Sequence, residues 1–84
     1  MQEFDKRKIF WHSRRGMLEL DLLLVPFVNE VFDTLSKSEK LSYLALIDEE
    51  DQDIFAWLVV GSAPAHTRYA SIISKILEHN KKYQ

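Results

Sequence analysis

Apolar side chains recur every three or four positions along almost the whole chain, and this spacing restricts the fold more than any other feature. The 84 residues include only two glycines and two prolines, and no stretch alternates apolar and polar side chains as a half-buried strand does. The pattern predicts an all-α fold of about five helices, at about residues 4–14, 17–33, 37–48, 51–60 and from Pro64 onward. Short connections favour a small, compact, antiparallel bundle. One hydrophobic core fits a chain of this length, so residues 1–84 form a single domain.

The predicted second helix is apolar around most of its circumference, which places it at the centre of the bundle. Pro26 lies within it and is expected either to bend the helix or to break it into two. Pro64 is expected in the first turn of the fifth helix, and Gly61 is expected to end the fourth. Apart from the regular core positions, the expected buried side chains include Trp11, Leu18, Leu22, Leu41, Trp57 and Val59.

Cysteine is absent, and this excludes disulfides, thiolate nucleophiles and cysteine-based metal sites. The longest apolar run, residues 22–28, is far shorter than the roughly 20 residues that span a bilayer. We therefore expect a cytoplasmic protein that does not insert into membranes.

The net charge of −2 is unevenly distributed along the chain. Residues 1–16 sum to +3, residues 17–63 to −8 and residues 64–84 to +3. Nucleic-acid binding needs a continuous positive face, and the acidic middle argues against one. An antitoxin-like or nucleic-acid-binding regulatory module, which would use the basic ends, remains the alternative function.

Metal binding and catalysis find no support in the residue pattern. His12, His66 and His79 fall in three different predicted helices without ligand spacing. The acidic run at residues 48–53 lacks the glycine and the glutamate that an EF-hand loop requires, so helix capping and solubility explain it better than calcium. No nucleophile set, carboxylate pair or phosphate-binding glycine loop is present, and we expect a protein that is not an enzyme.

The segment from Trp11 to Asp21 is the strongest candidate for a binding site, because it concentrates charged side chains around a glycine turn. Two interpretations are open at this point. The arginines could pair with carboxylates or phosphates of a partner, with Glu19 accepting from partner donors. Alternatively, Arg14 or Arg15 bridges to Glu19 or Asp21 within the chain, and Gly16 only ends a helix.

The same segment resembles the signature of the succinate dehydrogenase FAD-assembly factor family. The resemblance rests on Arg15-Gly16-Met17-Leu18-Glu19, followed by Pro26-Phe27, and on a second landmark at residues 51–58, DQDIFAWL. It extends over essentially the whole chain. Gln52 departs from the family pattern, in which many members have proline, and this change loosens the turn before the fourth helix.

The resemblance implies a bacterial, cytoplasmic assembly chaperone for the flavoprotein subunit of succinate dehydrogenase, or of fumarate reductase. Such a factor promotes covalent attachment of FAD to its partner and holds no cofactor stably itself, so FAD is delivered to or attached within the partner. We expect it to be a monomer. The partner-binding residues implied by position are Arg14, Arg15, Gly16, Met17, Glu19 and Asp21.

Overall fold

The computed structural model describes residues 4–64 and 67–81, and within these residues the protein is all-α, as the apolar spacing predicts. Five helices and two short helical segments follow one another along the chain. They are α1 (Lys6–Ser13), α2 (Leu18–Glu30), η1 (Phe32–Thr34), α3 (Lys37–Ile47), α4 (Asp51–Phe55), η2 (Ala56–Val60) and α5 (Arg68–Lys81). Within the described residues, none of the helices combines the length and the hydrophobicity that spanning a bilayer requires.

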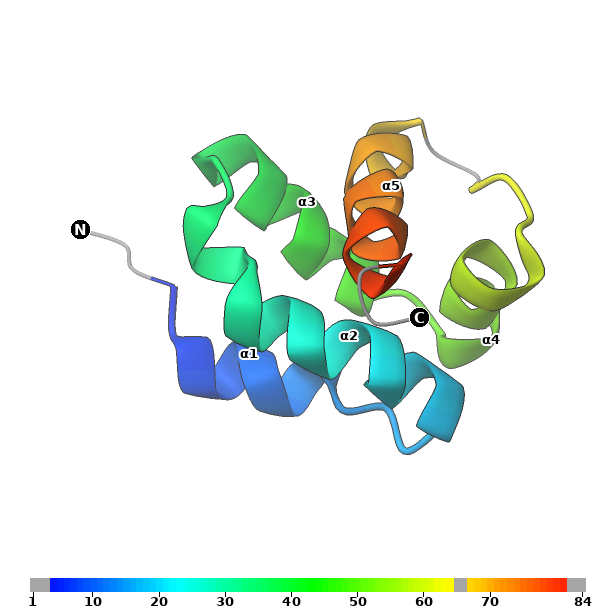
Figure 1. Ribbon diagram of the computed structural model, residues 1–84, viewed down its shortest axis with the longest axis horizontal. Helices are drawn as coiled ribbons and strands as arrows, with labels where there is room; N and C mark the ends of the chain where they lie inside the picture. Colours follow the sequence, from blue (N-terminus) through cyan, green and yellow to red (C-terminus); the bar gives the residue numbers. More distant parts are fainter. Residues whose placement is uncertain (1–3, 65–66, 82–84) are drawn as a thin grey trace.

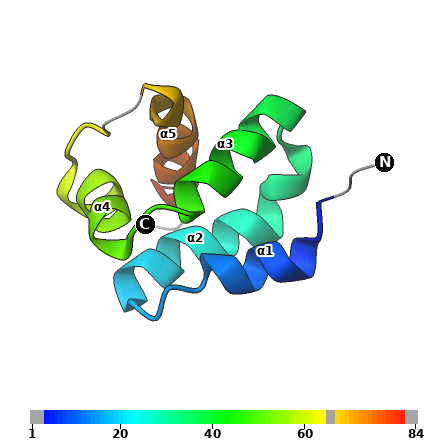
Figure 2. The ribbon, with the colours of Figure 1, turned by 180° about the vertical axis from the view of Figure 1, so that it is seen from behind.

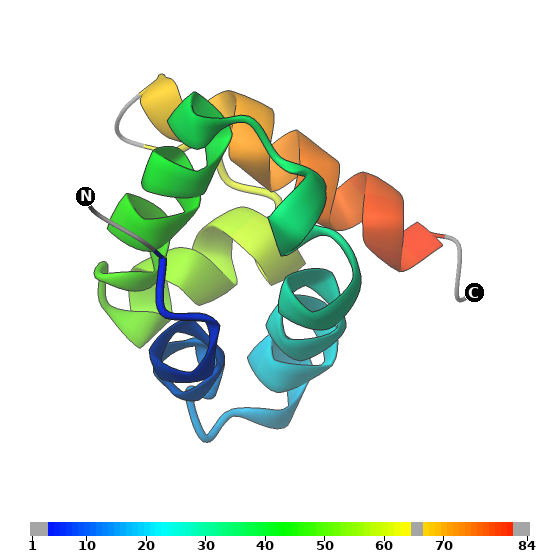
Figure 3. The same ribbon diagram turned by 90° about the vertical axis from the view of Figure 1, so that its left-hand side faces the viewer.

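Helix α2 lies at the centre of the molecule, as its apolar composition predicts. It runs antiparallel to α1, and the two lie side by side in all three views (Figures 1, 2 and 3). It also contacts α4, α5 and both short segments, while α3 packs against α5 and α1. Four of its side chains are completely buried: Leu20, Leu24, Phe27 and Val28.

Local sequence signals fix several helix ends. The Asp5 side chain accepts hydrogen bonds from the first-turn amides of α1, at Arg7 and Lys8. Ser36 and Glu39 form the reciprocal capping box that the sequence predicts, and the hydrogen bond from the Ser36 amide lowers the pKa of Glu39. Gly61 ends the fourth helical region with a left-handed φ of 95°, also as expected.

Pro26 neither ends nor splits the second helix, because α2 is continuous from Leu18 to Glu30. The helix stops three residues earlier than the apolar pattern predicts, and the chain tightens into the separate turn η1. The fourth helical region has the predicted extent but not one geometry. Its second half is a π-helix, in which the Gly61 amide donates to the Ala56 carbonyl five residues back at 2.9 Å.

Two groups of predictions are wrong. Pro64 lies outside a helix, since α5 begins at Arg68 and not at the proline. Several apolar side chains expected in the core are instead exposed. Helix α2 is apolar on more sides than its neighbours cover, and some apolar residues of the other helices also face solvent. These side chains are Trp11, Leu18, Leu22, Leu41 and Val59. The prediction for Trp57 is confirmed, since it is buried.

Candidate functional site

The corner between α1 and α2 is a tight turn whose backbone requires glycine. Arg14 and Met17 are extended, whereas Gly16 has a φ of +83°. A Cβ atom placed on Gly16 would meet nothing within 4 Å. The need for glycine here is therefore conformational rather than steric, since side-chain-bearing residues rarely adopt this region.

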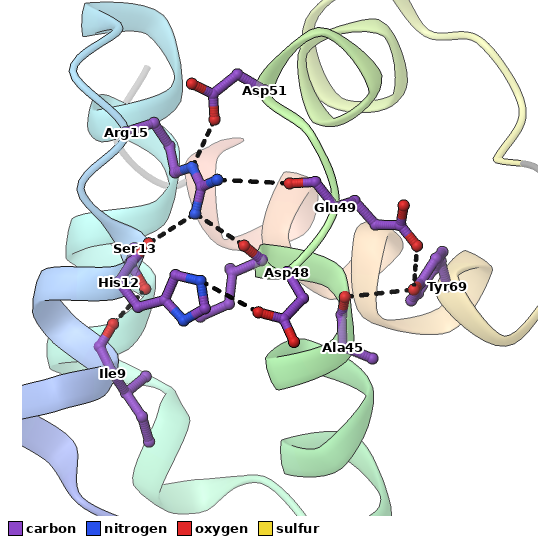
Figure 4. Close-up of polar contacts among 10 residues, drawn as sticks. Ile9, His12, Ser13, Arg15, Ala45, Asp48, Glu49, Asp51 and Tyr69 are labelled. Carbon is purple, nitrogen blue, oxygen red and sulfur yellow. Dashed lines mark hydrogen bonds and ion pairs between the residues drawn. The ribbon is translucent and has the colours of Figure 1, made fainter.

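The Arg15 guanidinium points inward from this turn and joins three helix ends (Figure 4). Its Nε lies 2.7 Å from Asp51 Oδ1, at the start of α4. Its Nη1 donates to the carbonyl of His12 at 2.7 Å, near the end of α1, and to that of Ile47 at 2.8 Å, at the end of α3. Nη2 donates more weakly to the Glu49 carbonyl at 3.4 Å.

Arg15 therefore links three helices of the fold, in addition to being part of the motif around Gly16. Only 14% of its side chain is exposed, and the carbonyls it binds at the ends of α1 and α3 lack the usual helical donors. A second contact between the same helices supports it: His12 Nε2 lies 3.3 Å from Asp48 Oδ1, an ion pair when the imidazole is protonated.

Asp21 holds the turn from the other side. Its Oδ1 accepts a hydrogen bond from the Arg15 amide at 2.8 Å, and its Oδ2 lies 3.8 Å from Arg14 Nε. The carboxylate sits in the first turn of α2, where the helix dipole favours a negative charge. The turn is therefore held by contacts of the Asp21 side chain within the chain itself.

A buried polar pair lies directly beneath the corner. The Ser13 hydroxyl donates to the Ile9 carbonyl at 2.8 Å, so the Tyr43 hydroxyl, 2.7 Å away, donates to Ser13 Oγ. Both side chains are buried, and burial raises the pKa of Tyr43 well above its usual range. The pair is a second link between α1 and α3, in addition to the contacts of Arg15.

The acidic run at residues 48–53 is used inside the molecule. Asp51 pairs with Arg15, and Glu49 Oε2 accepts from the Tyr69 hydroxyl at 2.7 Å. Burial, and next the hydrogen bond to Glu49, raise the pKa of Tyr69. Among the described residues no group of three or more potential ligands gathers around a metal position, and His66 lies outside those residues.

The predicted site residues with side chains beyond Cβ differ in how far they face the interior of the corner. Arg15 and Asp21 face into the corner. The long contact of Arg14 with Asp21 is the bridge that the second interpretation expects, whereas the Arg15 guanidinium pairs with Asp51 instead. Glu19 is exposed and makes no ion pair or hydrogen bond with any described residue. The side chain of Arg14 is half-exposed, and Met17 is half-buried against the core.

Sequence reasoning missed the apolar surface beside this corner. Trp11, Leu18 and Leu22 are each more than half exposed, and the last two border a shallow groove between α1 and α2. The sequence does contain an indication of this exposed surface, because α2 has apolar residues on more sides than a small bundle can cover. The apolar spacing instead predicts core positions for Trp11, Leu18 and Leu22.

Three comparisons place the chain among known proteins. A family model described as "Flavinator of succinate dehydrogenase" matches residues 7–80. A protein of Vibrio cholerae named FAD assembly factor SdhE is 41% identical over 75 residues, which cover 89% of this chain and 87% of that protein. A protein of the same name from Pseudomonas aeruginosa is 41% identical over 76 residues, 90% of each chain.

A solved structure shares the fold. The solution structure of the UPF0350 protein has a TM-score of 0.76 to this chain at 37% identity, covering 99% of this chain and 89% of the other. The family model spans most of the sequence and includes the corner around Gly16. The chain therefore belongs to the family of succinate dehydrogenase flavinators, as the motif at that corner indicates.

Proposed function

We propose that this protein is an assembly chaperone that binds the immature flavoprotein subunit of succinate dehydrogenase and promotes covalent attachment of FAD there. FAD is a substrate of the reaction in the partner, and this chain holds no flavin stably. Family membership and the names of the relatives support the assembly role. The flavoprotein subunit of fumarate reductase is a second proposed partner.

The observation that carries the proposal is an exposed carboxylate on a rigid corner. Glu19 extends from the first turn of α2, one turn beyond Gly16, and has no described partner of its own. Arg15 and Asp21 hold the turn that presents it. A charged group that is both fixed in place and unpaired is well suited to meet a donor on another protein.

The remaining residues of the corner have supporting roles in this proposal. The half-exposed Arg14 is available for a partner carboxylate, since its Asp21 contact is long at 3.8 Å. Met17 adds an adaptable apolar contact. Gly16 lets the partner backbone approach closely, because its Cβ position is empty.

Chaperoning by this corner requires a difference in affinity between two states of the partner. Binding shifts a conformational equilibrium only by the amount by which one state is bound more tightly. We infer that the bundle binds most tightly when the domains of the flavoprotein bring its histidine to the flavin, which raises the population of the reactive geometry. The factor acts as a monomer in the cytoplasm and leaves the finished enzyme.

In-gel flavin fluorescence of denatured flavoprotein tests this proposal. Cells lacking the factor are complemented with wild type, Glu19→Ala or Glu78→Ala, the last being an exposed acid on α5, away from the corner. We expect covalent flavin to be lost on deletion and restored by wild type and Glu78→Ala, but not by Glu19→Ala. Unchanged covalent flavin in the deletion strain would refute the assembly role.

A further inference from the structure

The corner proposed to meet the partner has two parts, which lie on different segments of the chain. Arg14 and Gly16 belong to the turn, whereas Glu19 belongs to the first turn of α2. The turn joins α1 to α2 at one end of the antiparallel pair (Figure 1). One partner surface can meet both parts at once only if the turn keeps a fixed position relative to α2.

A single residue of α2, Asp21, connects the turn to this helix on both sides of Gly16. The side-chain Oδ1 of Asp21 accepts a hydrogen bond from the Arg15 amide at 2.8 Å. The backbone amide of Asp21 donates to the Met17 carbonyl at 2.9 Å. The residues before and after the glycine are therefore both bonded to one position of α2.

The bond from the Asp21 side chain takes the place of an ordinary helix cap. Met17, the N-cap residue of α2, makes no side-chain hydrogen bond to the described helix start. Asp21 reaches past it to the Arg15 amide, and the loop closed in this way contains Gly16 with its φ of +83°. The turn is therefore fixed by a charge-assisted hydrogen bond together with a conformation that favours glycine.

The Asp21 carboxylate is also the more sheltered of the two acids in the first turn of α2. Only 20% of the Asp21 side chain is exposed, whereas Glu19 is exposed. A partner donor that used Asp21 Oδ1 would compete with the Arg15 amide, and a displaced amide must then find another acceptor. Direct contact with a partner therefore suits Glu19 and not Asp21.

We propose that Asp21 is a positioning residue, which holds the turn around Gly16 in the geometry that the flavoprotein subunit binds and does not contact the partner itself. The inference rests on the proposed function and gives one of its residues a different role. Asp21 acts through the Arg15 amide, so its function depends on accepting a hydrogen bond and not on its negative charge. A turn that is already ordered spares the partner the entropic cost of ordering it.

Three variants separate hydrogen bonding from charge and from general stability. Asp21→Asn keeps a side-chain oxygen that accepts from the Arg15 amide and removes the charge, whereas Asp21→Ala removes both. Asp5→Ala is the matched control, because the Asp5 carboxylate also accepts from backbone amides, those of Arg7 and Lys8. Asp5 lies at the start of α1, at the opposite end of the helix pair from the turn (Figure 1).

The test measures the dissociation constant of each full-length variant for the purified, flavin-free flavoprotein subunit, at a temperature where circular dichroism shows the variant to be folded. Amide hydrogen exchange followed by NMR reports on the Arg15 amide in the same samples. We expect Asp21→Ala to weaken binding about tenfold and to speed exchange of that amide. Asp21→Asn should bind within about threefold of wild type and keep the amide protected. Asp5→Ala should melt at a lower temperature but bind like wild type.

Several results would overturn the positioning role. If Asp21→Asn binds as weakly as Asp21→Ala while its Arg15 amide stays protected, the charge of Asp21 meets the partner directly. If Asp21→Ala binds like wild type, or if Asp5→Ala loses as much affinity as Asp21→Ala, the turn geometry does not control binding. Should Asp21→Ala fail to fold, Asp21→Asn decides the question by the same two measurements. A wild-type protein that does not bind the flavoprotein subunit refutes the proposed function as well, which none of the other results does.

Discussion

Replacement of Arg15 by alanine tests whether this side chain stabilises the fold or contacts the partner. The guanidinium makes three short contacts, at 2.7 Å to Asp51, 2.7 Å to the His12 carbonyl and 2.8 Å to the Ile47 carbonyl. Because Asp51 is 41% exposed, its ion pair is screened and stabilises the fold by only about 0.5–1 kcal/mol. Each charge-assisted bond to a carbonyl adds about 1–1.5 kcal/mol, so Arg15→Ala should cost about 3 kcal/mol.

A loss of about 3 kcal/mol is large for a domain whose total stability is about 5–10 kcal/mol. It should lower the melting temperature by about 12–24 °C. Urea unfolding followed by circular dichroism measures the free energy directly. Asp51→Asn keeps both carbonyl bonds and should cost about 1 kcal/mol or less, and Arg15→Lys should fall between the two.

Binding completes this experiment. The folded fraction of Arg15→Ala should bind the flavoprotein subunit with an affinity close to that of wild type, once the dissociation constant is corrected for unfolded protein, because Asp21 still holds the turn through the amide of residue 15. The reasoning is refuted if Arg15→Ala unfolds with a free energy within about 0.5 kcal/mol of wild type. That result, with lost binding, would make Arg15 a partner contact instead.

Three further predictions concern residues around the corner. Gly16→Ala should cost about 1 kcal/mol in urea unfolding through backbone strain alone, because its Cβ meets nothing within 4 Å, and a loss above about 3 kcal/mol would reveal a steric clash. Glu19→Ala should leave the free energy of unfolding within about 0.5 kcal/mol of wild type while lowering covalent flavin, so marked destabilisation would contradict its unpaired state. Tyr43 has a raised pKa in the folded protein, so its contribution is complete below the unfolded pKa of about 10 and is lost as the pH rises further. Unfolding measured from pH 8 to 11 should show this decline, and Tyr43→Phe should make it shallower; an equal slope in the variant would exclude Tyr43 as a source.

The helices and many of their ends could be read from the chain because the signals that specify them are local. The capping box of Ser36 and Glu39 needs only four consecutive residues. Gly61 and Gly16 adopt positive φ values that few other residues tolerate. Apolar spacing also identified α2 as the central helix, since nearly every side of it is hydrophobic.

The candidate site was located from the sequence, but the direction of its side chains was not. Arg15 reaches the carbonyl of Ile47 and the carboxylate of Asp51, 32 and 36 residues away, and no local pattern encodes such contacts. Glu19, four residues further on, points into solvent. A motif read from sequence therefore mixes residues that build the corner with residues that face a partner.

Residue order alone predicts the helical class, the central helix and the glycine turn, because each depends on periodicity or on the backbone preference of single residues. Which apolar faces are covered depends instead on how the helices pack together. A helix that is hydrophobic on most sides leaves some of them in water when the bundle supplies too few neighbours, and here Leu18 and Leu22 remain outside with Trp11. The number and placement of neighbours depend on long-range packing, which the spacing of residues along one helix does not specify.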